Sequence, residues 1–527
     1  MENYTPPATG PRYLLPVLAV ALAVVVVTRF FLMGKGTFFL PDEFRYSYSV
    51  RAAQLLLHGD WREFCASLAS TAGRPGDALV RLVPALLQHA LLALTGLNIA
   101  TPTSNVVPVL FNYVAVSLSA WYFYRICLLL LQNRPLALLG SVVYACLTNT
   151  NIYLRHILPY DAALLLMLFL VHYVLSLKRK GVPIRVRHYA GIGFLSALLV
   201  TVYPGYYMAP FIVLGVLVDW LHPLAFLQQR WKSVVAYVLG GAGVILLFEG
   251  VTRIGDASYI EGSYDLAHTI DQGSYEEGFT FLFKYLFQVE GLLGYALVLA
   301  LLAYLVMVAV DVVTQRERIT VNLSDTSKLL VVAAAFFLLH AAGGVLLHRV
   351  VFYGRLLHPF MPFLVIVTLL LLRRITAPGV RHGLMLSLAG VALLSFGLFF
   401  RDYQLVVYPV DVIYRMGINT GDKAYVRYYN QIKSYPGLVY SSPEPRTAGG
   451  GYVRIPGKVI TLLNFTYPFP LRPVAVPVPV SSFGNQLLFD DSHALNFRAY
   501  PFEGFTIAER QILPQLNLRI QVRAATL

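Results

Sequence analysis

The chain has 527 residues, of which 57% are hydrophobic and 13% are charged, and its mean hydropathy is +0.63. This composition excludes an ordinary soluble domain and predicts membrane-spanning segments of about 20 apolar residues each. The net charge of +14 fits Lys and Arg residues that hold loops on the cytoplasmic side, so we expect no nucleic-acid partner. Cys65, Cys127 and Cys146 are dispersed and have no spacing typical of a disulfide scaffold or a zinc site.

The first apolar segment runs from Tyr13 to about Met33. It is longer than the core of a cleaved signal peptide and lacks a clear cleavage site, so we expect a retained signal anchor. Length and hydropathy predict about eleven transmembrane helices in the whole chain. They lie near residues 13–33, 106–131, 135–152, 157–177, 189–204, 206–221, 233–251, 290–312, 329–348, 356–372 and 383–400.

Three loops between these segments are rich in Lys and Arg, which predicts that they face the cytoplasm. They are residues 178–187, 230–232 and 373–381. The alternation of spans then places the loops 34–105 and 252–289 outside, together with the C-terminal part of the chain. Within the first outer loop, residues 79–94 are apolar but are interrupted by polar side chains. A membrane span there would move the basic loop 178–187 to the outer side. We therefore expect an interfacial helix at residues 79–94 and an amphipathic helix around residues 48–56.

The composition changes after about residue 402, where apolar spans stop and prolines become frequent. Residues 516–523 alternate strictly between apolar and polar side chains, which is typical of a half-buried strand. The sequence therefore predicts an all-α polytopic membrane domain at residues 1–402. We expect a small extramembrane domain of β or α/β type, on the outer side, at residues 403–527.

Polar residues gather at the span ends that this topology places outside. Asp42 and Glu43 directly follow Pro41 just past the first span, where two acids are costly to place without a use. Arg offers a fixed fork of donors for phosphate, and a carboxylate can orient or deprotonate a sugar hydroxyl, so we expect a cleft for an anionic lipid head group. Asp42 and Glu43 are the candidate catalytic residues. The candidate binding residues are Arg45, Arg74, Arg155, His156, Asp161, Tyr353, Arg355 and His358.

Structural roles are the alternative for several of these residues. Arg side chains near span ends commonly extend to the membrane interface. Asp161 follows Pro159 and could cap the helix that begins there. Tyr203, Tyr206 and Tyr207 fit an aromatic belt at the membrane interface better than a binding site.

The order of these motifs resembles the GT-C membrane glycosyltransferases, in particular the branch of the protein O-mannosyltransferases and the lipid A aminoarabinose transferases. The similar segments are Pro41-Asp42-Glu43, Gly73-Arg74-Pro75, Leu94-Thr95-Gly96, residues 155–161 and residues 353–363, in a stretch of about residues 13–400. The resemblance implies a polyprenyl-phosphate sugar donor and inversion at the anomeric carbon, with Asp42 as the base. It also implies a lipid, glycan or protein acceptor at the outer face of a bacterial inner (plasma) membrane. Glu43 is the better candidate for a positioning group, because adjacent side chains point apart.

Metal use is left open by one departure from that branch, whose members carry a metal-binding acid where this chain has Gly73. The acidic outer loop 252–289 could form a divalent-ion site, for which Asp265 and His268 are the candidate ligands. A solvated acidic loop is the alternative. No other cofactor is indicated.

Three other kinds of function fit parts of the sequence. A lipid or sugar transporter would explain the many spans, but its ionisable groups would be expected near the midplane of the membrane. A polysaccharide ligase or polymerase would be expected to place Arg in a late outer loop, where residues 252–289 are acidic. A non-enzymatic scaffold would leave Asp42 and Glu43 unexplained.

Overall fold

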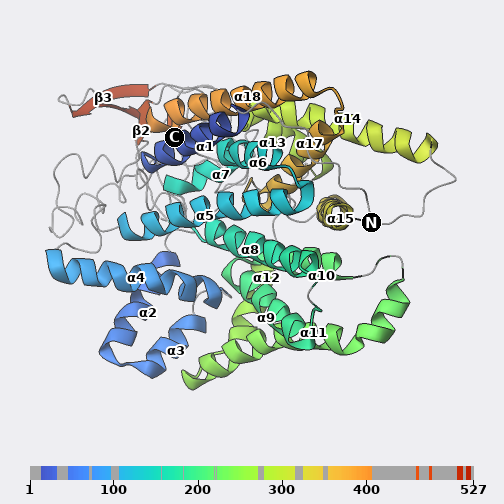
Figure 1. Cartoon of the computed structure of the whole chain (residues 1–527). Helices are drawn as coiled ribbons and strands as arrows, with labels where there is room; N and C mark the ends of the chain where they lie inside the picture. The colour runs from blue at the N-terminus through green and yellow to red at the C-terminus, as the bar shows by residue number, and fades with distance from the viewer. Residues whose placement is uncertain are drawn as a thin grey trace.

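The structure is a computed structural model, and helices make up the part that it describes before residue 406 (Figure 1). The described residues are 13–32, 45–69, 74–96, 106–155, 157–181, 183–218, 220, 222–270, 278–314, 324–347, 354–405 and four short strands. The helices are α1 (Leu14–Phe30), α2 (Tyr46–His58), α3 (Trp61–Ala69), α4 (Pro75–Thr95), α5 (Val106–Leu131), α6 (Arg134–Cys146), α7 (Thr148–Asn151), η2 (Ile152–Arg155), α8 (Tyr160–Arg179), α9 (Val186–Val202), η3 (Pro204–Tyr206), α10 (Ala209–Leu217), α11 (Pro223–Ile254), α12 (Tyr259–Ile270), η4 (Gly278–Thr280), α13 (Phe281–Gln288), α14 (Gly291–Thr314), α15 (Asp325–Leu347), α16 (Gly354–Leu357), α17 (Met361–Arg374) and α18 (Pro378–Leu405).

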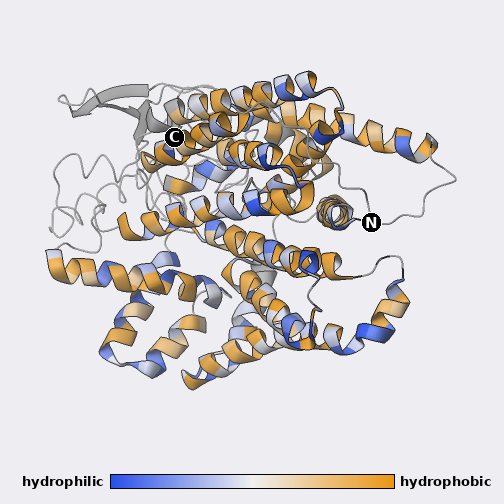
Figure 2. Cartoon of the chain, viewed as in Figure 1, coloured by the Kyte–Doolittle hydropathy of each residue, from blue (hydrophilic) through white to orange (hydrophobic). Residues whose placement is uncertain are grey.

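Seven helices of the described part are long and apolar enough to cross a membrane: α4, α5, α8, α11, α14, α15 and α18. Figure 2 shows that most of the residues along these helices are hydrophobic. The chain is therefore an integral, multi-pass membrane protein. Each of the eleven apolar segments predicted from the sequence coincides with a helix, but some of these helices are short. The count of eleven spans stays a prediction, as does the interfacial placement of α4.

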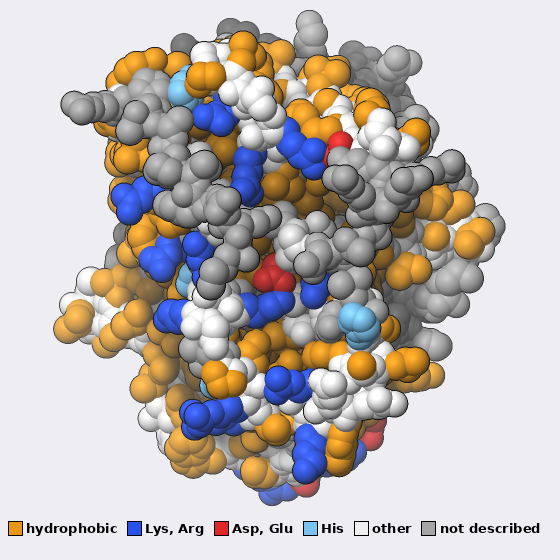
Figure 3. All heavy atoms as spheres, turned by 45° about the vertical axis from the view of Figure 1, so that its right-hand side comes forward, with side chains coloured by type: hydrophobic (Ala, Val, Ile, Leu, Met, Phe, Trp, Pro, Cys, Tyr) orange, Lys and Arg blue, Asp and Glu red, His pale blue; other side chains and the backbone are white. Residues whose placement is uncertain are grey.

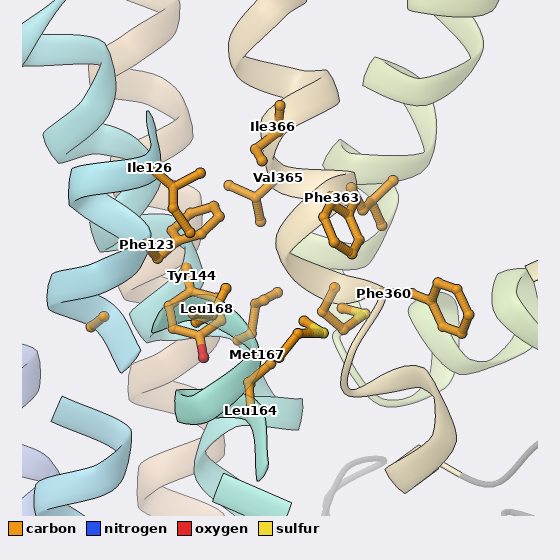
Figure 4. Close-up of a cluster of buried hydrophobic side chains, with 14 of the residues drawn as sticks. Phe123, Ile126, Tyr144, Leu164, Met167, Leu168, Phe360, Phe363, Val365 and Ile366 are labelled. Carbon is orange, nitrogen blue, oxygen red and sulfur yellow. The ribbon is translucent and has the colours of Figure 1, made fainter. Parts of the chain in front are cut away.

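The core of the bundle is formed by apolar side chains from helices far apart in the sequence (Figure 4). Phe123 of α5, Tyr144 of α6, Met167 of α8 and Val365 of α17 are all fully buried in one cluster. Lipid tails are as apolar as these side chains, so close packing contributes more to helix association than exclusion of water does.

Helices α9 and α11 pack closely through glycine. A Cβ atom on Gly193 would overlap the carbonyl oxygen of Tyr237, and one on Gly240 would overlap that of Ala190. Small residues of this kind let two membrane helices approach backbone to backbone. The contact fixes the end of α9, which leads into the site described below.

Gly193→Ala should lower the thermal stability of the detergent-solubilised protein, because the added methyl group forces α9 and α11 apart. Overpacking of this kind costs about 1–3 kcal/mol. Gly191 in the same helix is the matched control, since nothing lies within 4 Å of a Cβ built there. Thermal unfolding followed by intrinsic fluorescence measures both variants. Equal melting temperatures for Gly193→Ala and Gly191→Ala would contradict the close approach.

One end of the bundle carries the basic loops. Lys178 at the end of α8 donates to the carbonyl of Val216 at 2.9 Å and pairs with Asp325 at the start of α15. Arg179 donates to the carbonyl of Leu129 at the end of α5, also at 2.9 Å. Figure 3, which brings the right-hand side of Figure 1 forward, shows many more Lys and Arg than Asp and Glu side chains. That this end faces the cytoplasm stays a prediction.

Four strands are described in the C-terminal part: β1 (Val459–Thr461), β2 (Val474–Pro477), β3 (Ile507–Leu513) and β4 (Leu518–Arg523). They pair antiparallel in the order β1-β2-β4-β3. Strand β4 coincides with most of the alternating segment 516–523. A separate outer domain at residues 403–527 stays a prediction.

Candidate functional site

A buried polar cluster lies at the bundle end opposite the basic loops, where α8 and α17 begin. Asp161 lies in the first turn of α8 and His358 in the turn before α17, and both side chains are buried. The His358 Nε2 atom is 3.8 Å from Asp161 Oδ1. The hydroxyl of Tyr206 lies 3.0 Å from His358 Nδ1, and the tautomer of the imidazole decides which atom donates. Side chains from three segments that are distant in the sequence therefore meet in one polar cluster.

Arg29, in the last turn of α1, adds a fully buried positive charge to this cluster. Its Nε atom donates to Asn151 Oδ1 at 2.6 Å, and its Nη2 atom donates to the carbonyl of Ala145. The guanidinium also acts electrostatically on the Asp161 carboxyl. Arg29 is not among the site residues predicted from the sequence, although a charge inside an apolar segment is a signal for a functional or buried polar site.

The partners of Arg29 lie around the break between α6 and α7, and hydrogen bonds from other segments fix the backbone there. The carboxylate of the buried Glu290 accepts the backbone N–H groups of Thr148 at 2.7 Å and Asn149 at 2.9 Å. Asn149 Nδ2 donates to the Tyr285 hydroxyl at 2.7 Å. These bonds satisfy backbone donors that a helix start would otherwise leave without partners. The sequence analysis did not select Glu290 or Tyr285.

Arg74 lies at the start of α4 and is buried against the ring of Tyr203, with 5.1 Å between Cζ and the ring centroid. Two neighbours explain this position. Pro75 at the first helical position fits the fixed φ of proline. A Cβ atom on Gly76 would overlap Thr201 and the backbone at Val202, so glycine permits the start of α4 to pack on the end of α9.

Asp77 and Arg81 form a buried ion pair one turn apart in α4. Arg81 Nη1 also donates to the carbonyl of Ile157 at 3.0 Å, which connects α4 to the segment before α8. Arg45 and Arg74 both act electrostatically on the Asp77 carboxyl. Neither Asp77 nor Arg81 is among the site residues predicted from the sequence.

Helix α2 is fixed on this surface by Tyr46. Its hydroxyl donates to Gln88 Oε1 at 2.8 Å, and its ring centroid is 5.9 Å from Arg81 Cζ. Burial raises the pKa of Tyr46 well above its ordinary value, because the phenolate would lose its hydration. The hydroxyl therefore stays protonated and remains a donor at neutral pH.

Aromatic rings connect Arg74 with the Asp161 cluster. Ring centroids are 4.6 Å apart for Tyr203 and Tyr160, 5.0 Å for Tyr160 and Tyr153, and 5.5 Å for Tyr153 and His358. Tyr203 is buried, as is Tyr206 next to it. Burial of these two rings favours a place inside the bundle over the aromatic belt expected from the sequence, which exposed Tyr207 still fits.

The structure brings four of the predicted site residues to this end: Arg45, Arg74, Asp161 and His358. Four others lie outside the described residues: Asp42, Glu43, His156 and Tyr353. The backbone of Arg155 ends η2 and that of Arg355 lies in α16, but their side chains are outside the described part. Asp161 lies in the first turn of α8, so the structural alternative, an acid that stabilises the start of this helix, stays open.

The predicted metal ligands lie on α12. Asp265 is exposed there, and the side chain of His268 is outside the described part. Within the described residues, no three His, Cys, Asp or Glu side chains lie close enough together to hold a metal ion. An ion site in the loop 252–289 therefore stays a prediction.

No protein-family model matches this chain, and no curated protein matches its sequence. The function must therefore be argued from the chemistry and positions of the residues themselves.

Proposed function

We propose that the chain is an inverting membrane glycosyltransferase that transfers a sugar from a polyprenyl-phosphate donor to a lipid, glycan or protein acceptor. One observation carries the proposal: buried Arg74 lies against Tyr203, and both Arg74 and Arg45 lie close enough to Asp77 to act on its carboxyl. Asp161 and His358 meet at the same end of the bundle. Buried guanidinium groups suit a phosphate, because their planar fork matches its oxygens. The neighbouring acid and imidazole suit a polyol such as a sugar.

Arg45 and Arg74 would stabilise the negative charge that develops on the leaving phosphate, in a site shielded from water. Asp42 would take the proton of the acceptor hydroxyl while that oxygen forms its bond to the anomeric carbon and the bond from this carbon to the phosphate oxygen breaks. One displacement of this kind inverts the centre. Asp42 and Arg45 can act at the same site, because they are three positions apart in the chain and their Cα atoms therefore lie within about 11 Å of each other. Glu43 would position the substrate.

The direct test is carrier release. We expect the protein, reconstituted in vesicles, to convert decaprenyl-phosphate-linked glucose, mannose or arabinose to free decaprenyl phosphate when membranes of the source organism supply the acceptor. Mass spectrometry of the lipid fraction measures this product. No release above that of empty vesicles with any of the three donors would contradict the proposal.

Arg74→Lys should weaken binding of decaprenyl phosphate, because Lys keeps the charge but loses the fork of donors. We expect a loss of about 1–2 kcal/mol in binding free energy, near the range for a hydrogen bond to a charged group. Arg62→Lys is the control, since the Arg62 side chain is 72% exposed on α3. A titration in nanodiscs measures both variants. An unchanged dissociation constant for Arg74→Lys would assign Arg74 a structural role.

The proposed reaction also requires the site to face outward. In intact cells, a membrane-impermeant maleimide should label Asp60→Cys, between α2 and α3, and spare Lys180→Cys after α8. The native residues Cys65, Cys127 and Cys146 are buried and should give little background. Gly450→Cys should be labelled if residues 403–527 are outside. The reverse pattern at positions 60 and 180 would overturn the topology, and the site would then face the cytoplasm.

A further inference from the structure

Three buried side chains in the Asp161 cluster have hydrogen-bonding capacity that the described residues do not use. These are the Nη1 atom of Arg29, the Oδ2 atom of Asp161 and the Nε2 atom of His358, none of which has a hydrogen-bond partner among the described residues. Each residue has an exposed fraction of 2% or less. Leaving one such group unsatisfied costs about 1–3 kcal/mol, and native structures do so rarely. The set therefore fits a polar occupant.

The chemistry of the three atoms indicates a neutral occupant with hydroxyl groups. Arg29 Nη1 can only donate, whereas Asp161 Oδ2 can accept from or donate to a hydroxyl group, according to the protonation of its carboxyl. The Nδ1 atom of His358 is already engaged with Tyr206, which leaves Nε2 for the occupant. A phosphate is disfavoured, because Arg29 already donates to Asn151 and Ala145.

The cluster and Arg74 offer different chemistry to the two parts of a lipid-linked sugar, its phosphate and its sugar ring. Arg74 and Arg45 lie near the Asp77–Arg81 pair and offer two guanidinium groups to a phosphate, whereas Arg29 is the guanidinium near Asp161. The rings of Tyr203, Tyr160 and Tyr153 form a series of contacts that runs from Arg74 to His358. Sites for small molecules typically combine such aromatic walls with a few polar groups that fix the orientation of the ligand.

We infer that Arg29, Asp161 and His358 form a subsite that binds the hydroxyl groups of the transferred sugar, while Arg74 and Arg45 bind its phosphate. This inference rests on the proposed glycosyltransferase function. It assigns Arg29, which the motifs in the sequence do not include, to substrate recognition.

The test compares two lipids on the same protein. Decaprenyl phosphate and its glucose-, mannose- and arabinose-linked forms are titrated against the full-length protein in nanodiscs, for the parent, Asp161→Asn and His358→Asn. We expect the parent to bind at least one sugar-linked form more tightly than the bare carrier. Each variant should reduce that preference by about tenfold, the order expected for a lost hydrogen bond to a charged group. Affinity for the bare carrier should stay within about twofold of the parent, which also shows that the variants are folded.

Tyr207→Phe serves as the matched control, because its exposed hydroxyl contacts His340 and lies outside the three-residue subsite. It should keep the full preference for the sugar. A preference that survives in Asp161→Asn and His358→Asn would overturn the subsite and leave the proposed function standing. An equal loss of affinity for both lipids would place these residues at the phosphate and also overturn it. Binding of neither lipid to the parent would overturn the proposed function itself.

Discussion

Asp42→Asn should reduce sugar transfer by about 10²–10⁴-fold, the range for loss of a general base. The amide cannot accept the proton that leaves the acceptor hydroxyl, but it keeps the size and polarity of the carboxylate. Donor binding should therefore stay near that of the parent. The carrier-release assay measures transfer, and titration of decaprenyl phosphate in nanodiscs measures binding.

Asp60→Asn is the control for Asp42→Asn, because Asp60 is an exposed acid in the same loop, which is predicted to lie outside. It should transfer sugar at the parental rate. Transfer by Asp42→Asn within a few-fold of the parent would remove Asp42 from the role of base. Glu43→Gln should have the smaller effect of a positioning residue, seen mainly in the concentration of donor needed for half-maximal rate.

Arg81→Met should destabilise the protein by about 3–5 kcal/mol, the cost of breaking a buried ion pair by removal of one partner. Methionine has a similar volume, so the loss comes from the charge left on Asp77 and from the lost bond to the carbonyl of Ile157. A denaturant titration in detergent micelles measures the free energy of unfolding. Replacement of both partners, as in the double variant Asp77→Leu with Arg81→Met, should recover a large part of the loss.

Arg253→Met is the matched control for Arg81→Met. Arg253 pairs with Glu249 at the same spacing and in the same order along a helix, but its side chain is 56% exposed. Exposed pairs contribute about 0–1 kcal/mol, so this variant should remain close to the parent. Equal effects of Arg81→Met and Arg253→Met would show that the buried pair adds nothing beyond a surface pair.

The sequence predicted the positions of the long apolar helices, but not those of α3, α12 and α13. Helix α5 covers Val106–Leu131, the range predicted from its apolar run, because hydropathy over about 20 residues is a strong signal. Helix α6 ends at Cys146, six residues earlier than the apolar run predicts. There Thr150 Oγ1 donates to the carbonyl of Tyr144 at 3.0 Å and Asn151 Nδ2 donates to that of Ala145 at 2.9 Å. Such side-chain bonds replace the next helical turn, and hydropathy does not register them.

The candidate site was only partly predictable. Arg74, Asp161 and His358 could be selected because each is a polar residue at the end of an apolar segment. Arg29 carries a weaker signal, because a single Arg near the end of a span also fits extension to the interface. Its role depends on partners 116 to 122 residues away along the chain. Asp77 was missed for a similar reason, since burial of the pair depends on how α4 packs.

The distance along the chain between Arg29 and its partners has a consequence for biogenesis. Arg29 of α1 is synthesised before its partners, because Ala145, Thr150 and Asn151 follow 116 to 122 residues later. At a synthesis rate of about 5–20 residues per second, this delay is roughly 6–24 s. During that time the guanidinium has none of these partners, and an unsatisfied charge within an apolar helix is costly in lipid. We therefore expect nascent chains that stop before residue 145 to hold α1 near the translocon or a chaperone, and crosslinks from position 29 should move to α6 and α7 only once residue 151 has been inserted.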